Sequence, residues 1–258
     1  MSYDFNLNPV LEKASNEDLN FLVDLIIDTM TNMLCIEDEY IKYAPNHSKY
    51  THLIADEIRA FGGNTFANLF RGGDGPSYEE IVGDVAAKLK APHPKNCSIE
   101  RMEDAILETV LTQALEKMSD AEKRELLKEI GGGDVMALTG QGVTAAFITI
   151  FRLGGFKSYQ LTVIIVNAVL KAIIGRGLAL TGNAILTKAL SILTGPIGWV
   201  VTCVWTAIDI AGPATRVTIP AVVYIAMLRK KYNTPSCPHC KKMIAPGSKF
   251  CPDCGGAI

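Results

Sequence analysis

The stretch SNEDLNFLVDLII (Ser15–Ile27) shows how the N-terminal half of this chain is built. Ser15 stands three residues before Asp18, so its hydroxyl can accept a hydrogen bond in the first helical turn, where a carboxylate also suits the positive end of the helix dipole. Asp24 and Asp28 fall opposite an apolar stripe at helical spacing, which consists of Leu19, Leu22, Val23, Ile26 and Ile27. The stretch therefore predicts an amphipathic helix.

The same start signal occurs twice more. Ser77 precedes Glu80 by three residues, and Ser119 precedes Glu122 by three. In this pattern the hydroxyl and the carboxylate can satisfy two orphan backbone amides reciprocally. No stretch alternates apolar and polar residues with period two for long, which argues against strands. We therefore predict an all-α fold, a multi-helix bundle.

Charge divides the chain into two unlike parts. Residues 1–134 hold 13 Lys and Arg against 25 Asp and Glu, whereas residues 135–258 hold 12 basic and 2 acidic side chains. The formal net charge of -2 hides this asymmetry. Such an imbalance points to a membrane surface, to nucleic acid, or to one part of the chain resting against the other. In the last case an acidic helical face covers a basic one within the same molecule.

The composition changes at the glycine run Gly131–Asp134 (GGGD), because three glycines do not hold a helix. Between Val135 and Leu228 only seven residues are charged, and Ala189–Ile208 (ALSILTGPIGWVVTCVWTAI) carries no charge. This run has about the ~20 residues that cross a bilayer core. Gly195–Gly198 (GPIG) in its middle would kink or break a helix, so two half-helices around a turn fit as well as one straight span.

We expect three parts in the chain. They are an acidic amphipathic helical domain at residues 1–134, a hydrophobic, basic helical region rich in Ala and Gly at 135–232, and a small cysteine ribbon at 237–258. Pro220 suits the first turn of the last helix, where its missing N–H costs little. That helix would end at Arg229–Lys231, and Asn233–Ser236 would link it to the ribbon.

The ribbon carries the strongest chemical signal, CPHCKKMIAPGSKFCPDCGG (Cys237–Gly256). Two residues separate the cysteines of each pair, which is the spacing typical of structural zinc knuckles. Four thiolates leave no position for a reactive water, so such a site would not catalyse. His239, inside the first pair, is interpreted as a bystander. Because soft thiolates at this spacing favour zinc over iron, we predict one structural zinc ion bound by Cys237, Cys240, Cys251 and Cys254.

Motifs for catalysis are missing from the sequence. It contains no GxSxG elbow, no GxxxxGK[ST] loop and no HExxH pair. The glycine-rich stretch Phe61–Gly75 is interpreted as helix ends and a loop, because no strand precedes it. The N-terminus lacks a secretory signal, and three scattered cysteines indicate a reducing compartment: Cys35, Cys97 and Cys203. We therefore expect a non-enzymatic, cytoplasmic protein without a small-molecule substrate.

Two separated stretches carry a family likeness. The first is ADEIRAFGGNTFANLFRG (Ala55–Gly72) followed by DVAAKLK (Asp84–Lys90), and the second is GPATRVTIPAVVYIAMLRKK (Gly212–Lys231). In this order they resemble the bacterial YaaW family over most of residues 15–231, and part of the N-terminal half is similar to ubiquinol–cytochrome c assembly chaperones. The resemblance implies an all-helical, non-enzymatic protein and carries no catalytic residue across. The cysteine ribbon departs from the short family members, which end near the basic helix tail.

Two functions fit the apolar, cationic half. In the first, the protein associates with a membrane or inserts into it conditionally, as an effector or pore former would. Sparse Lys and Arg would then reach anionic lipid headgroups, and glycines would let helices approach closely. The protein would be peripheral or integral at the inner membrane. The spanning length of the uncharged run favours this hypothesis.

In the second, the protein is a soluble cytosolic chaperone or adaptor. The apolar half is then a buried core wrapped by the acidic helices, and the ribbon docks a protein client. The cations that would meet the acidic helices are Arg152, Lys171, Arg176 and Lys188. Nucleic acid is a weakly supported partner, because the ribbon lacks a base-reading helix. Either hypothesis is compatible with an oligomer.

Overall fold

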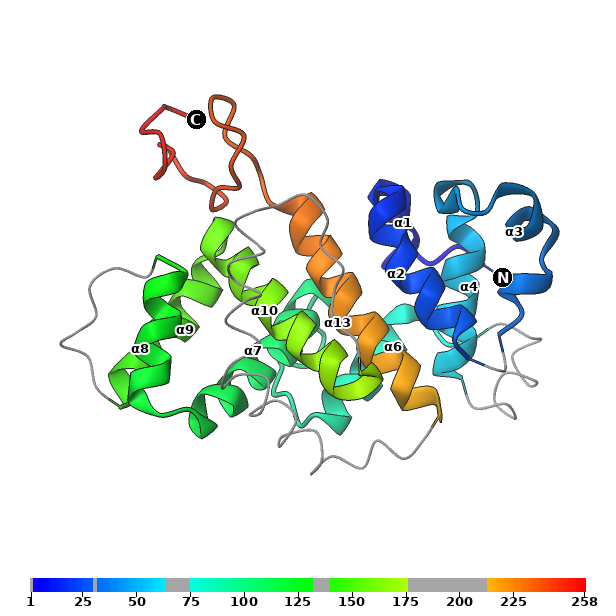
Figure 1. Cartoon of the computed structure of the whole chain (residues 1–258), viewed down its shortest axis with the longest axis horizontal. Coiled ribbons are helices and arrows are strands. Elements are labelled where there is room, and N and C mark those ends of the chain that lie inside the picture. The colour runs from blue at the N-terminus through cyan, green and yellow to red at the C-terminus, as the bar shows by residue number, and fades with distance from the viewer. Residues whose placement is uncertain (1, 30–31, 64–74, 132–139, 176–212) are drawn as a thin grey trace. The chain divides into compact units, whose positions relative to one another are not determined.

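The computed structural model describes residues 2–29, 32–63, 75–131, 140–175 and 213–258. In these residues the chain forms ten α-helices and two short 3-10 helices, with no strand longer than a single bridge (Figure 1). The predicted all-α fold class is therefore confirmed. Several predicted features lie outside the described residues, namely the uncharged run Ala189–Ile208, residues 64–74 of the glycine-rich stretch, residues 132–134, Arg176, Lys188 and Cys203.

Two of the predicted N-caps begin helices with a serine hydroxyl that accepts a backbone N–H. Ser15 starts α2 (Asn16–Ile27) and Ser77 starts α6 (Tyr78–Lys88). Each hydroxyl accepts the backbone N–H three residues further on, at 3.2 Å in both cases. The sequence pattern was sufficient to find these starts, because all the partners lie within one helical turn.

The third N-cap is a complete capping box at the start of α8 (Asp120–Glu129). The Ser119 hydroxyl accepts the Glu122 N–H at 3.3 Å, and the Glu122 carboxylate accepts the Ser119 N–H at 2.7 Å. The Ser119 hydroxyl also donates to the Glu122 carboxylate at 2.8 Å, and this hydrogen bond, together with the one from the Ser119 N–H, lowers the pKa of Glu122. Two backbone amides that would otherwise lack partners are thus satisfied by one pair of side chains.

The chain forms two compact units that interleave in sequence. Unit 1 comprises residues 1–106 and 209–229, and unit 2 comprises residues 107–208 and 230–258. Besides α2 and α6, unit 1 contains α1 (Asn8–Lys13), η1 (Leu34–Ile36), α3 (Asp38–Tyr43), η2 (His47–Lys49), α4 (Thr51–Gly62) and most of α13 (Pro213–Asn233). Besides α8, unit 2 contains α9 (Gln141–Leu153) and α10 (Gly155–Ile174), while α7 (Ile99–Lys117) contributes to both units. The three-part division expected from the sequence remains a prediction.

In unit 1 the last helix packs among the first ones. Every side chain from Ile219 to Arg229 of α13 is buried. The Tyr224 hydroxyl donates to the backbone carbonyl of Asp18 in α2 at 2.8 Å, and the Tyr224 and Phe21 ring centroids lie 4.4 Å apart. The core of unit 1 therefore needs residues from both ends of the chain.

Pro220 does not begin the last helix, so that prediction was wrong. The helix α13 begins at Pro213, and Pro220 lies inside it. Pro213 takes the first-turn position, where a missing N–H is harmless. An interior proline removes one backbone hydrogen bond. Burial of Ile219 and Ala221 on either side of Pro220 helps to offset that cost.

In unit 2 the helix α10 is the described part of the apolar region. All side chains from Ser158 to Leu170 are buried. Leu161, Ile164 and Ala168 of α10 line a small apolar cavity. The other side chains around it include Leu111 and Leu115 of α7 and Leu126 of α8. Among the described helices α10 is the one long and apolar enough to cross a bilayer, yet 72% of its most apolar window is buried in the protein. Its burial is that of a core helix.

Of the four cations that the second hypothesis places against the acidic helices, Arg152 makes such a contact. Arg152 of α9 donates from Nε to the Glu108 carboxylate of α7 at 2.9 Å. Lys157 of α10 donates to the backbone carbonyl of Gly131 after α8. Lys171 is exposed. The Arg152 side chain is 58% exposed, so its ion pair contributes little to stability.

Candidate metal centre

The ribbon consists of two knuckles with the same backbone geometry. The Lys241 N–H donates to the Cys237 carbonyl at 2.9 Å, and the Gly255 N–H donates to the Cys251 carbonyl at 2.9 Å. Lys241 and Gly255 both adopt the left-handed conformation, with φ of 62° and 71°. An isolated antiparallel bridge closes each knuckle, Ser236 with Met243 and Phe250 with Ala257. Each CxxC pair therefore occupies a turn of the same shape.

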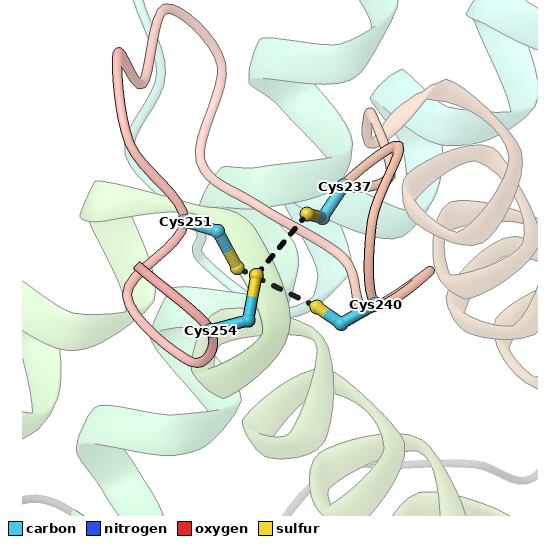
Figure 2. Close-up of side chains that lie close together, drawn as sticks. All are labelled: Cys237, Cys240, Cys251 and Cys254. Atoms are coloured by element: carbon cyan, nitrogen blue, oxygen red, sulfur yellow. Dashed lines mark hydrogen bonds between the residues drawn. The ribbon is translucent and has the colours of Figure 1, made fainter. Parts of the chain in front are cut away.

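The four cysteine side chains point toward one another (Figure 2). The Sγ atoms of Cys237 and Cys254 are 3.7 Å apart, those of Cys240 and Cys251 are 3.6 Å apart, and all four lie within 4.8 Å of one another. Sulfurs placed about 2.3 Å from one zinc ion at the corners of a tetrahedron are about 3.8 Å apart. The cluster therefore fits a single tetrahedral metal ion.

Three of the four cysteines also make up most of the ribbon's core. Cys237, Cys251 and Ile244 are buried together, Cys240 packs against them, and Cys254 is exposed. A module with one buried aliphatic side chain gains too little from apolar burial to fold by itself. Metal binding would supply the missing folding free energy, as it does in other small cysteine modules.

The thiols of Cys237 and Cys240 have pKa values shifted in opposite directions. The N–H of Cys240 donates to the Cys237 sulfur and, with the N–H of His239, lowers the pKa of Cys237 to about 6 against the effect of burial. The N–H of Lys242 lowers the pKa of Cys240, but burial and hydrogen bonds with Cys251 and Cys237 outweigh it and raise the value to about 12. A bound divalent cation would compensate the negative charge of several thiolates at once and so favour their ionised form.

His239 makes a contact of its own in the ribbon. One ring nitrogen, Nε2, lies 3.1 Å from the backbone carbonyl of Ala257. The ring also packs against Gly256, where an added Cβ would meet its Cδ2 at 2.6 Å. These contacts join His239 to the second knuckle, and its role as a bystander to metal binding stays a prediction.

Unit 1 contains a buried ion pair that sequence reasoning missed. Glu103 of α7 accepts from Arg229 Nε of α13 at 2.8 Å and from the Tyr78 hydroxyl of α6 at 2.9 Å. Arg229 Nη2 also donates to the Asn6 carbonyl at 2.5 Å. The side chains of Glu103 and Arg229 are 3% and 8% exposed. The sequence predicted that Arg229 belongs to a basic tail. Instead, Arg229 is buried and, together with Glu103 and Tyr78, joins α6, α7 and α13 to the N-terminal segment.

Burial sets the charge state of this ion pair. Desolvation raises the pKa of Glu103 to about 7, although Arg229 and the Tyr78 hydroxyl both favour the carboxylate. Burial lowers the pKa of Arg229, but the facing Glu103 outweighs burial and raises it. Tyr78 is also buried, and its pKa is raised well above the usual value. Arg229 therefore stays charged, while Glu103 can take up a proton near neutral pH.

The chain belongs to the family described as Ubiquinol-cytochrome C chaperone, which matches residues 46–223. The ribbon cysteines lie beyond that match. The likeness to ubiquinol–cytochrome c chaperones predicted from the two sequence stretches is confirmed.

The relatives of this chain include UPF0174 proteins. One from Helicobacter pylori strain J99 is 48% identical over 193 residues, which is 75% of this chain and 76% of the relative. The UPF0174 protein YaaW of Escherichia coli K12 is 32% identical over 189 residues, which is 71% of this chain and 73% of YaaW. The predicted likeness to YaaW is thus also confirmed. No solved structure matches the chain significantly.

Proposed function

We propose that the protein is a non-enzymatic cytosolic chaperone or adaptor whose ribbon docks a protein client. The family match over residues 46–223 carries the proposal, because the family is described as a chaperone. The burial of α10 supports it, since an apolar helix covered by protein serves as core rather than as a membrane anchor. The lack of catalytic motifs in the sequence agrees with it.

The client proposal is tested by photo-crosslinking from the ribbon. Phe250 is 66% exposed there, so a benzoyl-phenylalanine placed at Phe250 in the full chain probes whatever contacts the ribbon. We expect an adduct of one defined mass that disappears when Cys237→Ser and Cys251→Ser unfold the ribbon. The same probe at Phe5, which is 84% exposed in unit 1, is the control. Identical adducts from both positions, or adducts that survive loss of the cysteines, contradict the proposal.

We propose zinc as the metal of the cysteine cluster, one structural ion held by Cys237, Cys240, Cys251 and Cys254. Support comes from the all-thiolate donor set and the sulfur distances of 3.6 and 3.7 Å. The ion would fold the ribbon and would offer no open position for catalysis. Its ligands would be the four sulfurs alone.

Metal analysis of the purified chain tests the zinc proposal. We expect one zinc per chain in the wild type and none after Cys237→Ser with Cys251→Ser, while the far-ultraviolet circular dichroism stays helical. The matched control is Cys35→Ser with Cys97→Ser, which removes two thiols outside the cluster and should keep the zinc. Stoichiometric zinc in the first double variant would refute the ligand assignment.

Membrane association is a second candidate function, and one sequence observation favours it. Ala189–Ile208 carries no charge and has about the ~20 residues that span a bilayer. In this alternative the protein binds anionic lipid at the inner membrane and inserts conditionally. Carbonate and high-salt washes of cell membranes should then leave the protein in the pellet. A protein that is fully released, and that ignores anionic phosphatidylglycerol vesicles from pH 5 to 8, has no membrane role.

A further inference from the structure

The ribbon lies against the corner between α9 and α10, within unit 2. A Cβ added to Gly155 would meet the backbone nitrogen of Ala245 at 2.8 Å and the carbonyl carbon of Ile244 at 3.2 Å. A Cβ added to Gly154 would meet Cδ of Pro246 at 3.4 Å. The first distance is shorter than side-chain carbons tolerate, and the atoms it meets belong to backbone, which cannot swing aside. Ribbon residues 244–246 therefore approach the corner as closely as glycine permits.

The corner itself is a fixed surface. Gly154 and Gly155 have φ of 75° and 74°, a conformation that turns the chain sharply from one helix into the next. The buried Ser158 hydroxyl donates to the Phe151 carbonyl at 2.6 Å and ties the first turn of α10 to the last turn of α9. The Lys230 ammonium, in the last turn of α13, lies 4.7 Å from the centre of the Phe151 ring. The ribbon and the segment before it thus contact the same helix end.

One residue joins this contact to the metal centre. Ile244 is buried with Cys237 and Cys251 in the ribbon core, and its own carbonyl carbon faces Gly155. A shift of the ribbon off the corner would therefore move a residue that shares the buried core of Cys237 and Cys251. Because a coupling free energy acts equally in both directions, weaker docking of the ribbon would weaken metal binding, and loss of the metal would weaken docking.

We infer that Gly155 is a docking position for the ribbon, and that docking and metal retention are coupled: the corner holds the metal-bound ribbon, and metal loss loosens the corner. This inference rests on the zinc site proposed above. It assigns Gly155 a positioning role, because the glycine touches no metal ligand directly. Loss of the metal would then alter the contact between ribbon residues 244–246 and the corner between α9 and α10.

Two glycine substitutions, one at each end of α10, test the coupling. Gly155→Ala adds both a clash and a positive-φ strain. Gly175→Ala at the other end of α10 adds the strain without a clash among the described residues, since Gly175 has φ of 74° and no described atom lies within 4 Å of its Cβ position. We expect zinc transfer from the full chain to a chromophoric chelator to be about tenfold faster in Gly155→Ala and within about twofold of wild type in Gly175→Ala. Equal rates in the two variants would overturn the inference.

Hydrogen exchange in the wild type tests the reverse direction and does not depend on a variant that folds. Removing zinc from the full chain should speed amide exchange in residues 151–158 and leave residues 16–27 of unit 1 unchanged. Zinc that binds and leaves without any change at residues 151–158 refutes the coupling and spares the zinc proposal. A chain that never takes up zinc refutes the proposed metal site instead, so the two failures are distinguishable.

Discussion

Glu103 is almost completely enclosed and has three hydrogen bonds to its carboxylate, two from Arg229 and one from Tyr78. A buried pair of this kind adds little net stability compared with an apolar pair, but removing one partner leaves a charge in a medium that cannot solvate it. The residue therefore acts as a constraint: α6, α7 and α13 must all be present for its charge to be satisfied.

Glu103→Gln is expected to destabilise unit 1 by about 3 kcal/mol, because Arg229 keeps its charge and loses its partner. Urea unfolding at pH 8 measures the loss. Glu116→Gln, an exposed position on the same helix, should change the free energy of unfolding by less than about 0.5 kcal/mol. Equal stability of the two variants would show that Arg229 finds another partner.

The same pair predicts a pH dependence. Because the pKa of Glu103 is raised to about 7 in the folded state, the folded protein binds a proton that the unfolded chain releases above about pH 4.5. This contribution to stability is fully present below about pH 4.5 and is lost as pH rises through 7. The wild type should therefore gain stability relative to Glu103→Gln when pH falls from 8 to 5.5. A difference that is constant or shrinks over this range contradicts the assignment.

At the scale of single elements, the start of α8 is stabilised by a capping box made by two nearby residues, Ser119 and Glu122. Ser119→Ala removes the hydroxyl that accepts the Glu122 N–H and should cost about 1 kcal/mol of unfolding free energy. Ser119→Thr keeps an acceptor and should recover most of that loss. Thermal unfolding of both variants against wild type is the measurement, and an alanine variant as stable as the threonine variant would mean that the cap is redundant.

Features whose partners are close in sequence were predictable, and those with distant partners were not. The N-caps and the two CxxC knuckles were found because each is complete within a few residues. The Glu103–Arg229 pair joins positions 126 apart, so the sequence offered only an ordinary helix carboxylate and a basic tail. Pro220 was misplaced because the rule for first turns is local, whereas the burial of the residues around it comes from tertiary packing.

At the scale of the whole molecule, unit 1 is made from both ends of the chain. A chain of residues 1–212 lacks α13 and should lose cooperative unfolding of unit 1, because Glu103 and the apolar faces that pack on α13 lose their cover. A chain of residues 1–236 lacks only the ribbon and should keep it. Hydrogen exchange in α2 distinguishes the two. Protection in the shorter chain equal to that in the longer one would show that α13 is dispensable.

The hydrogen bond from Arg229 to the Asn6 carbonyl spans 223 positions, and this has a consequence for biosynthesis. Asn6 is synthesised 223 positions before Arg229, so α1, α2 and α4 are made well before α13, which completes the core of unit 1. We therefore expect unit 1 to be prone to aggregation until α13 has been synthesised.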